Sequence, residues 1–186
     1  MKKLIVIICI LGLINCTDAT GQYSRMNLVL DCGYSLPLAS MRTYYNGGFE
    51  FNMKTITSLS KRRSDLRVSV VTNVGYYMFG GKSYFGYDSH GYFTEFRSSS
   101  FAVIPIHAGL RVDVGHTKES PIGMYMSQDF GLTYVDGPTG GSRYGHSFVL
   151  GCLLGRFDME MAFHAWKRSN GNNFRYFTLG MGVVIF

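Results

Sequence analysis

Residues 66–78 read LRVSVVTNVGYYM, a stretch in which apolar side chains recur at every second position. Val68 and Val70, for example, alternate with Arg67 and Ser69. Successive side chains of a strand point to opposite faces, so this period predicts a strand with one apolar and one mostly polar face. The stretch is also longer than the five or six residues of an ordinary strand, and it matches the roughly 9–11 residues that a tilted strand needs to cross a bilayer.

The same period of two recurs along the chain and predicts eight strands in all. The other seven strands are expected at residues 27–36, 48–54, 101–113, 123–132, 148–155, 157–166 and 176–185. The apolar face carries almost no charge, which favours a lipid-facing surface over the outside of a soluble secreted ligand-binding β-barrel. The prediction is therefore an all-β fold, an eight-stranded antiparallel up-and-down transmembrane β-barrel.

The predicted connections alternate between two length classes, as in membrane barrels with short periplasmic turns and longer outer loops. The turns are expected at Ser58–Asp65, Gly115–Pro121 and Gly155–Arg156, and the outer loops at Pro37–Thr43, Gly80–Ser100, Val135–Gly145 and Lys167–Asn173. Charged residues make up 16% of the chain, against about 25% in soluble domains, whereas glycine (23) and aromatic residues (15%) are abundant. This composition excludes a disordered chain.

The amino terminus predicts export. Lys2 and Lys3 precede the apolar run 4–14, and Ala19-Thr20-Gly21 provides small residues for cleavage before Gln22. We expect residues 1–21 to be a secretory signal peptide and residues 22–186 to be the outer-membrane β-barrel domain. Cleavage before Cys16 with lipid attachment, and a buried N-terminal helix, are the alternatives. Export argues against a nucleic-acid partner despite the net charge of +6.

The interior of an eight-stranded barrel is just wide enough to be filled by side chains. Polar-face charges concentrate toward the predicted periplasmic half, and a buried charge without a partner is costly. We therefore expect a lumenal network of paired charges, with solvation by water as the alternative for some members. Its expected members are Lys54, Arg67, Arg111, Asp113, Asp158 and Glu160. Aromatic girdles are a further expectation, with Tyr34, Tyr44, Tyr45, Tyr76, Phe79, Tyr134, Trp166 and Phe174 in the outer ring.

Three segments resemble the outer membrane protein beta-barrel domain family of Gram-negative bacteria. They are the Ala19–Gly21 cleavage site, the mid-barrel segment Val103–Arg111 and the final segment Leu179–Phe186 with its terminal aromatic residue. The resemblance implies a bacterial outer-membrane location and insertion by the barrel-assembly machinery, with Phe186 as the C-terminal assembly signal. Contact with outer-membrane lipids, including lipopolysaccharide, is also expected, and a monomer is the default expectation. The expected lipid-facing residues of this segment are Leu179, Met181, Val183 and Ile185. Strict alternation therefore places the terminal Phe186 on the opposite, lumenal face.

The sequence carries no pattern typical of a cofactor or metal site. His107 and His164 share the lumenal face, where hydrogen-bonded histidines are expected rather than a metal pair. Cys32 and Cys152 are expected in lipid on strands that are not neighbours, so no disulfide is predicted. His146 and Ser147 are the candidate pair for a lipid A-modifying hydrolase of the outer leaflet, but adjacent strand residues point to opposite faces.

The segment 80–100 is the best candidate for binding a surface protein partner, because exposed aromatic residues favour interfaces. Its candidate contacts are Tyr84, Phe85, Tyr87, Tyr92 and Phe93; the alternative is a hairpin that pairs these rings. Lys167, Arg168 and Arg175 at the outer rim could contact lipopolysaccharide phosphates. The predicted role is non-enzymatic: structural, adhesive or partner-binding through extracellular loops. A narrow solute channel, a lipid-modifying enzyme and a soluble ligand-binding barrel are the alternatives.

Overall fold

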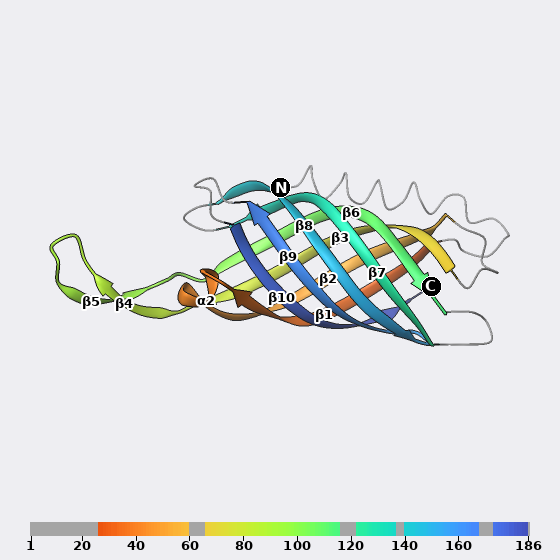
Figure 1. The fold of residues 1–186 in the computed structure, drawn as a ribbon, viewed down its shortest axis with the longest axis horizontal. Helices are drawn as coiled ribbons and strands as arrows, with labels where there is room; N and C mark the ends of the chain where they lie inside the picture. The colour runs from red at the N-terminus through yellow and green to blue at the C-terminus, as the bar shows by residue number, and fades with distance from the viewer. Residues whose placement is uncertain (1–25, 60–65, 116–121, 137–139, 168–172, 186) are drawn as a thin grey trace.

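The computed structural model describes residues 26–59, 66–115, 122–136, 140–167 and 173–185, and eight of its strands form one closed barrel (Figure 1). The order around the barrel is β1, β10, β9, β8, β7, β6, β3 and β2. This confirms the predicted eight-stranded antiparallel architecture. The barrel strands are β1 (Met26–Leu38), β2 (Tyr45–Ser58), β3 (Leu66–Gly81), β6 (Phe101–Val114), β7 (Ile122–Val135), β8 (Gly141–Leu154), β9 (Phe157–Lys167) and β10 (Asn173–Val184).

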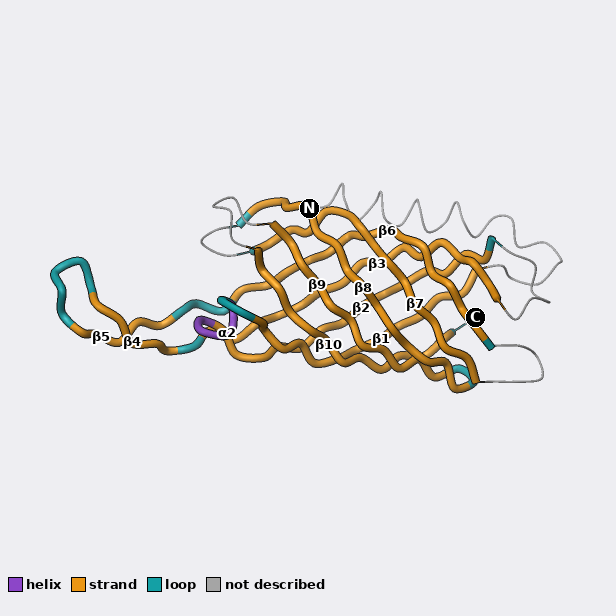
Figure 2. Tube along the Cα trace, in the orientation of Figure 1, coloured by secondary structure: helices purple, strands orange, loops and turns teal. Residues whose placement is uncertain are grey.

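The barrel closes by antiparallel pairing of its first and last strands. The register between β1 and β10 runs from Val29 opposite Val184 to Leu38 opposite Arg175. Because every barrel strand has two neighbours, the eight barrel strands leave no open sheet edge among themselves, which satisfies their backbone polar groups inside hydrocarbon. No helix in the described part of the chain is long and apolar enough to cross a membrane. Figure 2 shows that strands make up nearly all of the barrel wall.

The side chains alternate along each strand as the sequence predicts, with the apolar set on the outside. On β7, the apolar residues Met124, Leu132 and others stand exposed, whereas Tyr125 and Asp129 are buried in the lumen. Gln128 is the polar exception on this outer face, and its Nε2 donates to the Ser147 carbonyl at 3.2 Å. A polar side chain in hydrocarbon is thus satisfied within the protein.

The two ends of the barrel differ in the length of their connections. At one end, β8 and β9 are joined only by Gly155 and Arg156, with Gly155 in the left-handed region (φ +65°). At the other end lies the one-turn helix α2 (Met41–Tyr44), and from this end a hairpin of β4 (Ser83–Tyr87) and β5 (Phe93–Arg97) projects far beyond the barrel (Figure 1). By the rule of short periplasmic turns, the hairpin end is the outer end.

Three members of the expected outer aromatic girdle lie inside the barrel, so that part of the prediction was wrong. Phe79, Trp166 and Phe174 are at most 8% exposed. On its strand, each of these residues alternates in step with the side chains that point into the lumen. The strands stay regular up to the outer mouth, so these rings also point inward. Tyr34, Tyr44, Tyr76 and Tyr134 do stand exposed on the outer surface.

A charge introduced on the outer face at mid-depth should destabilise the inserted barrel. Ile106 is the sixth residue of β6 and faces outward. We expect Ile106→Arg to lower the free energy of unfolding in lipid vesicles by about 2–4 kcal/mol, because arginine is costly near the bilayer midplane. The measurement is urea unfolding followed by tryptophan fluorescence. Ser99→Arg, at an exposed site outside the barrel, is the control; equal effects at both sites would contradict a membrane-spanning outer face.

Candidate functional site

The middle of the lumen holds an ion cluster centred on Lys54. The Lys54 ammonium lies 2.9 Å from Asp31 Oδ2 and 2.5 Å from Glu160 Oε2, so it bridges carboxylates on β1 and β9. Asn52 Nδ2 donates to the second oxygen of Asp31 at 2.8 Å. All four side chains are buried. Removing either partner of such a pair would leave an uncompensated charge in the lumen.

A second group, nearer the periplasmic end, is centred on Arg111. Its Nε and Nη2 both donate to Asp113 Oδ1, at 2.8 and 2.7 Å, and its Nη1 lies 3.9 Å from Asp158 Oδ2. The guanidinium carbon stands 3.4 Å from the centre of the Tyr125 ring, a cation–π contact. The Tyr125 hydroxyl lies 2.7 Å from Asp158 Oδ1 and 2.9 Å from Glu160 Oε2. Tyr125 therefore links the Arg111 group to the Lys54 group.

The structure brings five of the six sequence-predicted charges into these two groups. The sixth, Arg67, lies half-buried on β3, opposite Asp113 in the register with β6. Sequence reasoning missed Asp31, Glu50 and Tyr125. Asp31 and Glu50 have the lumenal parity on their strands, but parity within one strand does not give the depth relative to other strands. Only the register across β1, β2, β9 and β10 brings them beside Lys54.

Carboxylate oxygens of Asp31, Glu50 and Glu160 all lie within 4.8 Å of one another, a spacing that could hold a metal ion. The residues do not favour that use, because the Lys54 ammonium already stands between Asp31 and Glu160. Ser35 Oγ also donates to Glu50 Oε2 at 2.9 Å. The cluster is thus arranged around a cation supplied by the chain itself.

Two glycines provide the space for this cluster. Gly33 and Gly180 face each other across β1 and β10, with Glu50 opposite Gly33 and Glu160 opposite Gly180. A Cβ on Gly33 would lie 2.7 Å from Glu50 Oε1, and one on Gly180 would lie 3.2 Å from Glu160 Cγ. The glutamates lean over the glycines, which explains part of the high glycine content.

The outer mouth of the lumen is filled by a cluster of aromatic side chains, which we call the aromatic plug. Trp166 and Phe174 stack with ring centres 4.3 Å apart, and Phe79 stacks on Phe101 at 5.1 Å. Below them, Tyr176 stacks on His164 at 4.6 Å. The plug consists of Met41, Tyr77, Phe79, Phe101, Val103, Val135, Trp166, Phe174 and Tyr176. Its upper member Met41 comes from α2, so the first outer loop helps to fill the mouth.

The candidate hydrolase pair is separated by the regular geometry of β8. Ser147 is fully buried in the lumen, whereas His146 lies half-buried and contacts Phe130 at 6.4 Å between ring centres. The histidine that does lie beside Ser147 is His107, whose Nδ1 is 3.4 Å from Ser147 Oγ and whose Nε2 is 3.0 Å from Thr133 Oγ1. His164 Nε2 lies 3.3 Å from Thr178 Oγ1. The two lumenal histidines therefore contact hydroxyl groups.

The predicted loop contacts belong to the β4–β5 hairpin. Phe85, Tyr87 and Phe93 share one face and are 67%, 74% and 65% exposed. Phe85 and Tyr87 both contact Phe93, at 5.7 and 5.5 Å between ring centres. Tyr84 points to the other face, where it stacks on Phe96 and meets Tyr44 of α2. Tyr92, at the tip, is exposed.

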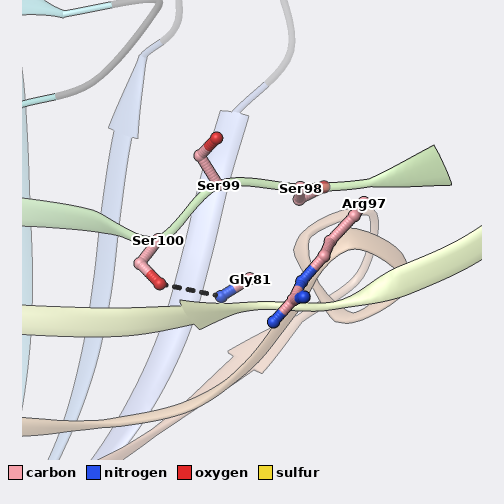
Figure 3. Close-up of a pocket in the computed structure, with 5 residues that line it drawn as sticks. All are labelled: Gly81, Arg97, Ser98, Ser99 and Ser100. Atoms are coloured by element: carbon pink, nitrogen blue, oxygen red, sulfur yellow. Dashed lines mark hydrogen bonds between the residues drawn. The ribbon is translucent and has the colours of Figure 1, made fainter.

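A shallow pocket lies at the base of the hairpin and is lined by Gly81, Arg97, Ser98, Ser99 and Ser100. Ser100 Oγ accepts the Gly81 N–H at 3.3 Å. Figure 3 shows that Arg97 and Ser99 point away from each other, so the pocket does not gather polar groups around one point. The remaining predicted features, residues 1–21, Arg168 and Phe186, lie outside the described residues.

Comparison with solved structures identifies the class of fold. No protein-family model matches the sequence, and no curated protein matches it either. The outer membrane enzyme PagL aligns with a TM-score of 0.55 and 8% identity, over 84% of this chain and 98% of that chain. The Yersinia pestis outer membrane protein Ail, in a phospholipid bilayer nanodisc, aligns with a TM-score of 0.50 and 12% identity, over 86% and 99%. Neisserial surface protein A aligns with a TM-score of 0.48 and 16% identity, over 86% and 97%.

The chain has the fold of the eight-stranded outer-membrane β-barrels. Its closed eight-stranded wall is shared with PagL and Ail, and its exposed apolar outer face fits a bilayer. One of these two structures is of an enzyme, so the fold is compatible with more than one activity. At this level of identity the comparison establishes the fold alone.

Neutralising Lys54 should destabilise the barrel more than neutralising the whole cluster. We expect Lys54→Met to cost about 3–5 kcal/mol, because it leaves Asp31 and Glu160 buried together without a cation. The triple variant Lys54→Met, Asp31→Asn, Glu160→Gln should recover most of that loss. Urea unfolding in lipid vesicles measures both.

Lys82→Met at the exposed base of the hairpin is the matched control and should change stability by less than about 0.5 kcal/mol. A Lys54→Met barrel as stable as the control would show that water, rather than the ion pairs, solvates the lumenal carboxylates.

Proposed function

We propose that the protein is a non-enzymatic surface-binding protein of the outer membrane, which holds the β4–β5 hairpin outside the cell to contact a protein partner. The observation that carries the proposal is the exposed aromatic face of Phe85, Tyr87 and Phe93. The hairpin extends along the barrel direction beyond the wall, so these rings stand away from the lipid-facing surface (Figure 1). Aromatic side chains of this kind dominate the energetics of protein interfaces.

The construction of the hairpin supports a binding role. Its two strands pair over five residues each, and the opposite face is supported by Tyr84, Phe96 and Tyr44. The aromatic face is therefore presented on a paired and packed element, which lowers the entropy that binding must offset. Both outer edges of the two-stranded sheet also offer backbone groups that an extended partner segment can pair with.

A solute channel is the less favoured function. The lumen contains the aromatic plug at the outer mouth and the two ion groups below it, and an eight-stranded barrel has little space beyond its side chains. We expect no single-channel conductance in planar bilayers for the wild-type protein.

A hydrolase acting on outer-leaflet lipid is the second alternative. Such an enzyme needs a nucleophile and a base that act together at the membrane surface. Among the described residues, Ser147 is buried in the lumen beside His107, under the plug, so lipid would have no direct approach to it. Expression of the protein should leave the mass of lipid A unchanged.

Lipopolysaccharide and the barrel-assembly machinery are the partners we propose for the membrane-embedded part. Lys167 and Arg175 stand exposed on the outer face at the outer ends of β9 and β10, where lipid phosphates lie. The assembly machinery would act on the C-terminal strand, whose outer-facing residues Leu179, Met181, Val183 and Ile185 are exposed to lipid.

Replacing the aromatic face should abolish binding without unfolding the barrel. The triple variant Phe85→Ser, Tyr87→Ser, Phe93→Ser would be produced in cells that otherwise lack the protein. Binding of these cells to purified extracellular matrix proteins and to cells of a second bacterial strain would then be measured. We expect at least a tenfold loss of binding. The heat-dependent shift in gel migration, which reports the folded barrel, should stay unchanged because only exposed side chains are lost.

The control is Glu95→Gln with Thr94→Ser on the same hairpin, which keeps every ring. Binding that survives in the triple variant, or a wild-type protein that increases adherence to none of these surfaces, would overturn the proposed function.

A further inference from the structure

The lipid-facing wall carries a row of sulfur side chains that the sequence alone does not reveal. Met124 lies opposite Cys152, Cys152 opposite Met159, Met159 opposite Met181, and Met181 opposite Cys32. The row therefore crosses the adjacent strands β7, β8, β9, β10 and β1 without interruption. All five residues belong to the outward-facing set, and both cysteines are free thiols.

We propose that Cys152, Met124 and Met159 form a binding site for a soft monovalent metal ion, Cu(I) or Ag(I). Directly opposite residues on paired strands have Cβ atoms about 4.5–5.5 Å apart, so side chains of this length can bring their sulfur atoms around one point. Cys152 has a methionine on each side, which gives one thiolate and two thioethers. Soft sulfur ligands of this kind select Cu(I) among the biological metals.

The charge balance suits a site that faces hydrocarbon. Binding exchanges the thiol proton for the metal ion, so that R–SH and M⁺ give R–S–M and H⁺, and the proton leaves to water. The complex of one thiolate, two neutral thioethers and a monovalent cation carries no net charge. It therefore avoids the cost of placing a net charge in lipid, whereas a divalent ion with the same ligands would not.

The position of the three residues gives the ion a route from water. Cys152 is two residues before the end of β8, and Met159 is the third residue of β9, so both lie close to the tight turn at Gly155 and Arg156. Met124 is likewise the third residue of β7. With about 3.3 Å per residue, the site lies near the periplasmic interface rather than at the bilayer centre.

The same three strands provide a built-in control. Two residues further into the membrane, Met126 lies opposite Leu150, and Leu150 lies opposite Met161. This row has two methionines in the same geometry and on the same face, but a leucine where the thiol would be. Methionine in lipid is therefore not by itself the feature that defines the site.

The test is titration of the detergent-extracted protein with Ag(I), and with Cu(I) against a chromophoric chelator. We expect Cys152→Ser to weaken binding at least 100-fold and Met124→Leu with Met159→Leu to weaken it at least tenfold. Met126→Leu with Met161→Leu should change it less than twofold. Bound metal should also protect Cys152 from alkylation by a maleimide.

The leucine substitutions keep the apolar surface, and heat-modifiable migration verifies that each variant is folded. If the two double methionine-to-leucine variants bind the metal with equal affinity, the metal binds to the thiol alone and the site is refuted. Wild-type protein that binds no metal, or binding that persists in Cys152→Ser, refutes it as well.

Discussion

The pairing of β1 with β10 is the contact on which the rest of the molecule depends. Without it, two long strand edges would expose backbone N–H and C=O groups to hydrocarbon, where no water can bond them. Once the sheet is closed, each barrel strand must present one face to lipid and one to the lumen. The low charge content, the period of two and the length of the strands are all consequences of this closure.

Closure also determines what the lumen can contain. The interior of eight strands is narrow, so the polar groups that are kept out of the lipid must satisfy one another inside. The chain does this in two ways at different depths. Lys54 and Arg111 neutralise carboxylates in the lower part, and the aromatic plug fills the outer mouth with side chains that need few partners. Both arrangements favour a rigid barrel over an open channel, and a rigid barrel is what the proposed binding role of the hairpin requires.

The alternation of side chains was enough to predict the strands, their faces and their closure, because the choice between lipid and lumen is made residue by residue. It was not enough to predict partners. Lys54 meets Asp31 and Glu160 only because the register across four strands brings them to one level, and that register is a property of the closed barrel.

Phe79, Trp166 and Phe174 were misplaced for a different reason. The alternation along their strands already indicated the lumenal face, but the prediction followed the general rule that aromatic residues form a ring at the membrane interface. For segment 80–100 the sequence left two alternatives, partner contact through exposed rings or a hairpin that pairs these rings. Composition alone does not decide between them, because aromatic residues suit both.

Register creates order on both surfaces of the wall at once. Inside, it produces the row Glu50, Gly33, Gly180 and Glu160, in which two glycines make space for two carboxylates. Outside, the same pairing of β1, β10 and β9 aligns Cys32, Met181 and Met159, and the pairing of β9 with β8 and of β8 with β7 adds Cys152 and Met124. A slip of one residue between two strands would turn the side chains of the shifted strand to the opposite face and break both rows. A shift of two residues would keep every face and still break both rows. The lipid and the lumen require only the correct face, so neither of them accounts for rows that are aligned across four and five strands.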